Sequence, residues 1–226
     1  MLVARSLLEY SLVIKNYLQK THIAMRKSDL DFWQGMAAHY SKFMRRSAPV
    51  YAEICNHIRP HLTRDMNVLE LACGTGQLSF PLSPYVRLWE ATDVSSSMIA
   101  EAKKRTGSSR LHFSVQDAAH LPYVSETFDV VIANALHILP EPDRVLREAR
   151  RVLKPGGWLF APTFVHAGGK LARLRTWGME RTGFRIYHAW NAGEFIAYLS
   201  SHDFWVVEHA LLGGRVLPVC YAAGRK

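Results

Sequence analysis

After Asn67 the chain alternates short apolar runs with amphipathic stretches of helix length, and this rhythm constrains the fold more than any other feature of the sequence. Runs rich in Val, Leu, Ile and Phe that alternate with helical stretches are typical of strands and crossover helices in a mostly parallel sheet. The sequence therefore predicts an α/β fold. We expect strands at 67–71, 87–92, 111–116, 128–134, 158–164, 204–211 and 216–222, and helices at 77–82, 96–104, 142–153 and 192–201.

The length of 226 residues is ample for one domain with a substantial core and short for two. We expect residues 31–226 to form that domain, with two leading helices in 31–65 and a long connection, 166–190, after the fifth strand. Residues 1–30 are expected to be an N-terminal amphipathic extension, because apolar residues recur there at helical spacing. Packing on this domain or on a partner is the favoured role of the extension, and contact with a membrane surface is the less favoured one.

Cysteine and histidine usage narrows the class of protein. The three cysteines, far apart in the chain, are Cys55, Cys73 and Cys220. They predict no disulfide framework, which fits a reducing cytoplasm, and the chain has no run of about 18 apolar residues that would span a membrane. His57 and His61 have the spacing of a metal pair, but Pro60 disturbs the helix between them. We therefore expect no metal.

A glycine-containing turn follows the first predicted strand. The strand carries Glu70 and runs directly into Gly74 and Gly76, after which a helix opens. Glycines permit a tight turn and let a ligand approach bare backbone, while the helix start offers free N–H groups. Ser79 stands where a dinucleotide-binding loop has its third glycine, so pyrophosphate is the less favoured ligand.

Two further carboxylates follow the next strands. Asp93 ends the second strand, 19 residues after Gly74, where open α/β sheets place an acid that binds ribose hydroxyls. Asp117 follows the third strand. With Glu70 these acids are expected to face one crevice at the carboxyl ends of the strands, which favours a polar or cationic ligand. The alternative for Asp93 is an N-cap of the helix at 96–104.

Five motifs, in order, resemble one family. They are 70–76 as an acid-x-x-x-Gly-x-Gly loop, Asp93 with Ser95 and Met98, Asp117-Ala118 with Leu121-Pro122, 128–131, and 151–157. Over about 32–223 the chain resembles the class I S-adenosylmethionine-dependent methyltransferases. It is most similar to their small-molecule group, methyltransferase type 11, which includes the ubiquinone and menaquinone biosynthesis enzymes. The resemblance implies a Rossmann-like fold whose sheet has seven mostly parallel strands, helices on both faces and an antiparallel last strand.

The resemblance also implies a cofactor, S-adenosylmethionine, with S-adenosylhomocysteine as product. Asp93 would hold the ribose hydroxyls, Asp117 the adenine amino group, and Met98 would pack on the base. Tyr40, on a leading helix, would cover the cofactor, the alternative being a core residue. The other implied contacts, to the methionine part or through backbone, come from Glu70, Ala72, Gly74, Gly76, Val94, Ala118, Asn134 and Ala135.

A base is needed if the methyl acceptor is a hydroxyl or a protonated amine. His137, just past the fourth strand, is the first candidate because a histidine titrates near neutral pH. A structural or cofactor-side role is the alternative for this residue. His166 and His188, at the two ends of the 166–190 connection, are weaker candidates.

The formal charge of +9 at pH 7 is unevenly distributed. Residues 1–47 hold eight basic and three acidic residues, residues 166–190 hold five and one, and the rest is balanced. In the resembling family these two regions cover the acceptor, so we expect a small-molecule acceptor with anionic or aromatic character. A nucleic-acid substrate, contacted through the basic segments, is less favoured because 134–137 reads Asn-Ala-Leu-His, without the Pro-Pro-aromatic motif of base-amino methylation. A non-catalytic cofactor-binding regulator is the remaining alternative.

Overall fold

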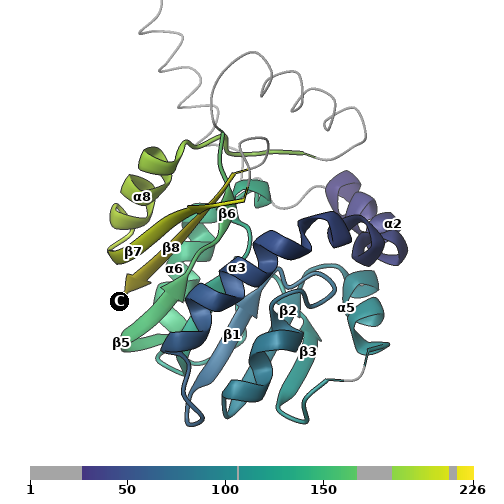
Figure 1. The fold of residues 1–226 in the computed structure, drawn as a ribbon, viewed down its shortest axis with the longest axis horizontal. Coiled ribbons are helices and arrows are strands. Elements are labelled where there is room, and N and C mark those ends of the chain that lie inside the picture. The colour runs from purple at the N-terminus through teal and green to yellow at the C-terminus, as the bar shows by residue number, and fades with distance from the viewer. Residues whose placement is uncertain (1–26, 106, 167–184, 214–217) are drawn as a thin grey trace, which may run out of the picture.

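The computed structural model describes residues 27–105, 107–166, 185–213 and 218–226. Its strands are β1 (Asn67–Leu71), β2 (Leu88–Asp93), β3 (Leu111–Val115), β4 (Phe128–Ala133), β5 (Leu153–Phe160), β6 (Thr163–Phe164), β7 (Trp205–Leu212) and β8 (Val219–Arg225). They form one sheet in the order β3-β2-β1-β4-β5-β8-β6, with β7 paired to β8 (Figure 1). The predicted α/β fold is confirmed, with eight strands instead of seven.

Strand direction follows the prediction. The pairs β1–β2, β1–β4, β2–β3 and β4–β5 are parallel, whereas β8 runs antiparallel to β5, β6 and β7. The additional strand arises where a single strand was expected at 158–164. Pro162, which has no N–H to donate to a ladder, separates β5 from the two-residue β6.

Helices cover both faces of the sheet. They are α2 (Lys27–Phe43), α3 (Ala48–Ile58), α4 (Ser79–Leu82), α5 (Ser96–Lys103), α6 (Pro142–Val152) and α8 (Ala192–Ser200), with 3-10 turns η1 (Met44–Ser47), η2 (Arg59–His61), η3 (Ser83–Tyr85) and η4 (Leu136–Ile138). One core cluster joins α6 and α8 to one face of the sheet, and the other joins α3 and α4 to the opposite face. In Figure 1, α3 crosses in front of the sheet, with α5 beside β3 and α8 beside β7.

The helix expected at 77–82 is shorter in the structure. It begins only at Ser79 and passes into η3, which starts next to Pro84. Prolines at 81 and 84 explain the short length, because each removes a helical hydrogen-bond donor. The amphipathic extension lies outside the described residues apart from the start of α2, as does most of the 166–190 connection. None of the helices in the described part of the chain has the length and apolar character to span a bilayer.

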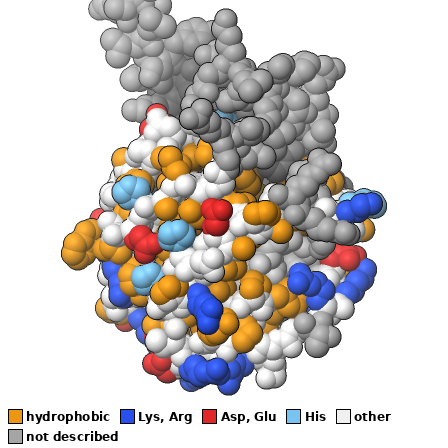
Figure 2. All heavy atoms as spheres, viewed as in Figure 1, with side chains coloured by type: hydrophobic (Ala, Val, Ile, Leu, Met, Phe, Trp, Pro, Cys, Tyr) orange, Lys and Arg blue, Asp and Glu red, His pale blue; other side chains and the backbone are white. Residues whose placement is uncertain are grey.

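The two histidines with metal-like spacing bind a carboxylate in the structure. His57 Nδ1 lies 2.8 Å from Glu208 Oε1 and His61 Nε2 lies 3.2 Å from Glu208 Oε2. Histidine and acidic side chains lie next to each other on the left of the face shown in Figure 2. Among the described residues no group of three or more His, Cys, Asp or Glu can hold a metal ion. The contacts tie the end of α3 and η2 to β7.

Candidate active site at the carboxyl edge of the sheet

The loop after β1 has three left-handed backbone positions. Ala72, Gly74 and Gly76 have φ values of 54°, 55° and 85°. A methyl group added at Gly76 would lie 2.6 Å from the Phe80 ring, so glycine is required there by both conformation and space. Ala72 holds a conformation that L residues rarely adopt, which marks the start of the loop as conformationally constrained.

Asp93 lies beside this loop, as the sequence predicts. Its Oδ2 accepts the backbone N–H of Gly74 at 2.9 Å and its Oδ1 accepts the N–H of Ser95 at 2.9 Å. Burial raises the pKa of the Asp93 carboxyl, and the two backbone N–H groups lower it. Ser95, and not Asp93, caps α5 by accepting the Met98 N–H. The N-cap alternative for Asp93 is therefore wrong, and its carboxylate ties β2 to the glycine loop.

The leading helix α2 lies over the same loop. A methyl group added at Gly74 would come within 3.0 Å of Tyr40 Cε1, so the tyrosine ring is packed directly on the loop backbone. Gln34, six residues earlier, accepts the Ser97 N–H with Oε1 at 2.9 Å. The helix α2 therefore contacts both the glycine loop, through Tyr40, and the start of α5, through Gln34.

Glu70 does not face the crevice with the other two acids, which corrects that expectation. Its side chain is fully buried, and a single oxygen, Oε2, accepts from Ser79 Oγ at 2.5 Å and Trp89 Nε1 at 2.9 Å. Burial raises the pKa of the Glu70 carboxyl to about 7, although both hydrogen bonds lower it. Oε1 has no partner within the described structure. Glu70 thus supports the loop from below, between β1 and the layer of α3 and α4.

A second group of predicted residues lines one pocket. Ala72, Val94, Asp117 and Ala118 share this pocket with Leu139 and Glu141. The Asp117 carboxylate is exposed and accepts the Ala119 N–H at 2.9 Å, which fixes the turn after β3. Met98 is buried at the start of α5. Asp93 at the end of β2 and the turn that follows β3 lie at the same edge of the sheet.

The residues after β4 complete that edge. Asn134 donates its backbone N–H to Leu71 O at 3.4 Å and its side-chain amide to the Tyr51 hydroxyl at 3.4 Å. Ala135 is nearly buried, at 7% exposure. Asn134 thus connects the end of β4 to the end of β1 and to α3.

His137 is enclosed behind β6. It is 3% exposed, and its Nδ1 lies 3.0 Å from Thr163 Oγ1. Burial, with His166 and His188 nearby, lowers the pKa of His137 to about 3. The ring is therefore neutral at pH 7 and a weak base, which favours the structural alternative for this residue.

The described end of the 166–190 connection, residues 185–190, contacts the turn that holds His137. The carbonyl of His137 accepts the N–H groups of Tyr187 and His188 at 3.0 and 3.1 Å. The His188 ring stacks on Trp190 at 4.9 Å, and Trp190 stacks on Tyr198 of α8 at 4.7 Å. The three candidate histidines are thus brought together, and an aromatic stack lies beside them.

Several residues at the site were missed by the sequence argument. Arg105 stacks on the Phe80 ring at 3.8 Å and donates to the Thr75 carbonyl at 3.2 Å, which braces the glycine loop. Gln34 and Thr163 contact the site from segments 63 and 26 residues away from their partners. No spacing rule marks such distant polar contacts. Arg105 alone could be noticed in the sequence, as a basic residue just after the helix predicted at 96–104.

Comparison with known proteins agrees with the motifs. Residues 68–157 match the family described as a methyltransferase domain. A ubiquinone/menaquinone biosynthesis C-methyltransferase of Bordetella avium is 36% identical over 126 residues, 53% of this chain and 49% of that protein. A demethylmenaquinone methyltransferase of Lactobacillus johnsonii is 38% identical over 97 residues, 39% of this chain and 40% of that protein. The chain thus spans about half or less of the length of these curated relatives.

Solved structures share the fold. A chain from the complex between the Haloferax volcanii Trm112 methyltransferase activator and a methyltransferase has a TM-score of 0.73 at 18% identity, covering 85% of this chain and 96% of that one. A Thermotoga maritima S-adenosylmethionine-dependent methyltransferase has a TM-score of 0.68 at 19% identity, covering 87% and 99%. Residues 68–157 therefore match a methyltransferase domain, and the described chain has the fold of the class I S-adenosylmethionine-dependent methyltransferases.

Proposed function

We propose that this protein transfers a methyl group from S-adenosylmethionine to a small-molecule acceptor. The observation that carries the proposal is the contact between Asp93 and the glycine loop, at the edge of the sheet that Tyr40 covers. A carboxylate, bare loop backbone and an aromatic ring suit the hydroxyls, the charged amine and the sulfonium of this cofactor.

The residues present fit the cofactor in chemistry as well as in place. Each Asp93 oxygen accepts one backbone N–H and keeps a further lone pair for a ribose hydroxyl. Val94 and Ala118, in the pocket beside Asp117, present an apolar floor with one exposed carboxylate for an adenine amino group. Glu70 would act on the loop and not on the ligand, because its side chain is fully buried and both donors to Oε2 come from the protein.

The cofactor supplies an activated methyl group, so this chain mainly has to align an acceptor and exclude water. We assign alignment of the acceptor to three rings near His137, a region that we call the acceptor side: Phe164, which packs edge-on against His137, and His188 and Trp190, which stack on each other. Flat apolar surfaces of this kind favour an aromatic acceptor. The curated relatives, by name enzymes of quinone biosynthesis, support the same class.

His137 remains the proposed proton acceptor only for a methyl acceptor whose own pKa is far below that of an ordinary hydroxyl or phenol, because the pKa of His137 is lowered to about 3. Its neutral ring can receive a proton, but burial makes the imidazolium costly. For any other acceptor the role of His137 is structural only: its contact with Thr163 holds β6 against the turn after β4.

Binding of S-adenosylhomocysteine, measured by calorimetry, tests the proposal. We expect Asp93→Ala to weaken binding at least about 100-fold, because two hydrogen bonds to a charged group are each worth about 1.5–3 kcal/mol. Thermal unfolding of the variant separates this loss from misfolding. Unchanged affinity in a folded variant would show that the site is misplaced.

The acceptor class is tested with radiolabelled S-adenosylmethionine. Wild-type protein is incubated with reduced demethylmenaquinone, with a small-molecule extract and with bulk RNA, and Asp93→Ala is the blank. Label in the small molecules supports the proposal. Label confined to RNA would replace it with the nucleic-acid alternative, and binding without any transfer would favour a regulator.

A further inference from the structure

Asp29, near the start of α2, is a buried carboxylate whose two oxygens have different partners. It is only 7% exposed. The Tyr187 hydroxyl donates a hydrogen bond to Oδ2, and Arg185 Nε lies 3.9 Å from Oδ1. A carboxylate removed from water needs such partners, because an unpaired buried charge is costly. The contact therefore joins two segments that lie 158 residues apart in the chain.

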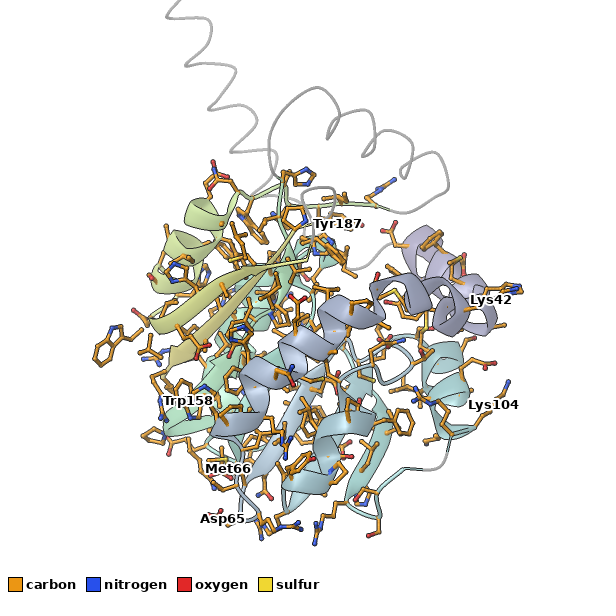
Figure 3. The ribbon with its side chains drawn as sticks, viewed as in Figure 1. Lys42, Asp65, Met66, Lys104, Trp158 and Tyr187 are labelled. Atoms are coloured by element: carbon orange, nitrogen blue, oxygen red, sulfur yellow. The ribbon has the colours of Figure 1, made fainter. Side chains whose placement is uncertain are left out.

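Tyr187 is held to the sheet by its backbone at the same time. Its N–H donates to the carbonyl of His137 at 3.0 Å, in the turn that follows β4. Figure 3 shows Tyr187 near the end of the sheet, close to α2. One residue thus links α2, through its side chain, to the acceptor side of the proposed site, through its backbone.

The rest of α2 is attached on the cofactor side. Gln34 accepts the Ser97 N–H at 2.9 Å, and Tyr40 is packed on Gly74. Asp29, Gln34 and Tyr40 therefore fasten one helix to the acceptor-side segment, to α5 and to the glycine loop. Asp93 lies between these attachments, bonded to both the loop and the Ser95 N–H.

We propose that Asp29 and Tyr187 are positioning residues that hold α2 closed over the cofactor, so that how long the cofactor stays bound depends on a contact at the acceptor side. This rests on the proposed function, since it assigns the ligand beneath α2. A ligand enclosed by α2 can leave only after the helix separates from the loop, and the Tyr187–Asp29 hydrogen bond opposes that separation. A segment that contacts the acceptor would thereby influence the cofactor without touching it.

The test measures release of S-adenosylhomocysteine from the whole protein by surface plasmon resonance. Tyr187→Phe removes only the hydroxyl, and we expect its release rate to rise roughly tenfold. Tyr198→Phe is the matched control, because the Tyr198 hydroxyl also donates to an aspartate, Asp143 in the first turn of α6. Its release rate should equal that of wild type.

Substitutions at the other end of the bond add a rescue. Asp29→Asn keeps an oxygen that accepts from Tyr187 but has no charge for Arg185, whereas Asp29→Ala keeps neither. We expect release to speed up more in Asp29→Ala than in Asp29→Asn, with the association rate nearly unchanged in both. If Asp29 only stabilised the fold, its substitution would lower the unfolding temperature without producing this order of release rates.

Amide hydrogen exchange of α2 in the ligand-free protein gives an independent result. Exchange over 27–43 should be faster in Tyr187→Phe and unchanged in Tyr198→Phe. Equal release rates in the two tyrosine variants, or equal exchange of α2, would overturn the positioning role. If wild type does not bind S-adenosylhomocysteine, the proposed function fails, and the exchange experiment still decides whether the bond holds α2.

Discussion

Replacing Glu70 with Gln isolates the effect of one buried carboxyl on the stability of the fold. Burial raises its pKa from 4.5 to about 7. Between these two values the folded protein retains a proton that the unfolded chain has released. The folded state therefore has its full stability below pH 4.5 and loses part of it as the pH rises through 7.

The magnitude follows from the two pKa values. One pKa unit corresponds to about 1.36 kcal/mol, so ionisation of Glu70 lowers the free energy of unfolding by about 3 kcal/mol above pH 7. Gln carries no charge, and its single side-chain oxygen can replace Oε2, which accepts from both Ser79 and Trp89. We expect the stability of Glu70→Gln relative to wild type to increase by about 3 kcal/mol between pH 4.5 and pH 8.

Urea unfolding followed by circular dichroism at several pH values from 4.5 to 8 measures this difference. Other groups titrate as well, but they contribute equally to both proteins and cancel. Glu53→Gln, on an exposed position of α3, controls for the loss of one surface charge. A stability difference between Glu70→Gln and wild type that stays constant across this range would refute the reasoning.

Two further variants test the loop and the turn after β4. Gly76→Ala should destabilise the protein by about 2–5 kcal/mol, because the φ of Gly76 is left-handed and the added methyl group would clash with Phe80. The control Gly156→Ala, with φ 69° and no atom within 4 Å of the added methyl group, should cost only about 1–2 kcal/mol. Equal urea midpoints for the two variants would contradict this. Because the pKa of His137 is lowered to about 3, wild type should lose stability relative to His137→Gln by about 1.4 kcal/mol per pH unit as the pH falls below 6.5. Urea unfolding at several pH values measures this, and a difference between the two proteins that does not change with pH would exclude a buried neutral ring.

The centre of the sheet was predictable because β1 and β4 are buried on both faces and read as nearly continuous apolar runs. Polar residues after such runs mark the carboxyl edge, which is why Asp93, Asp117 and the glycine loop were found from spacing alone. Tyr40 was found through the family resemblance and not through its pattern, since an aromatic residue at helical spacing fits a core equally well.

The face of the sheet on which the Glu70 side chain lies was not predictable. In a half-buried strand the alternation of polar and apolar residues shows which face a side chain takes, but β1 is buried almost throughout and shows no alternation. The break at Pro162 does have a signature in the sequence, because a proline inside a strand run signals an interruption. Contacts such as Asp29 with Tyr187 have no local signature, because they depend on how the chain folds between them.

The helix α3 behaves as a fixed support for whatever α2 does. Its N-terminal half is held by the Tyr51 hydroxyl, which accepts from the Asn134 amide, and its C-terminal end by the contact of His57 with Glu208. The two helices meet at the short η1 turn, whose 3-10 hydrogen bonds are weaker than those of an α-helix, so α2 is expected to rotate there.

Along such a lever the position of a contact decides its effect. At 1.5 Å per residue, Tyr40 lies about 6 Å from Met44 and Asp29 about 22 Å from it. A rotation that moves Tyr40 by about 2 Å would move Asp29 by about 7 Å, far beyond the reach of a hydrogen bond. The contact at Asp29 therefore has roughly four times the moment arm of the one at Tyr40, so a hydrogen bond there resists rotation about four times as effectively as an equally strong contact near the turn.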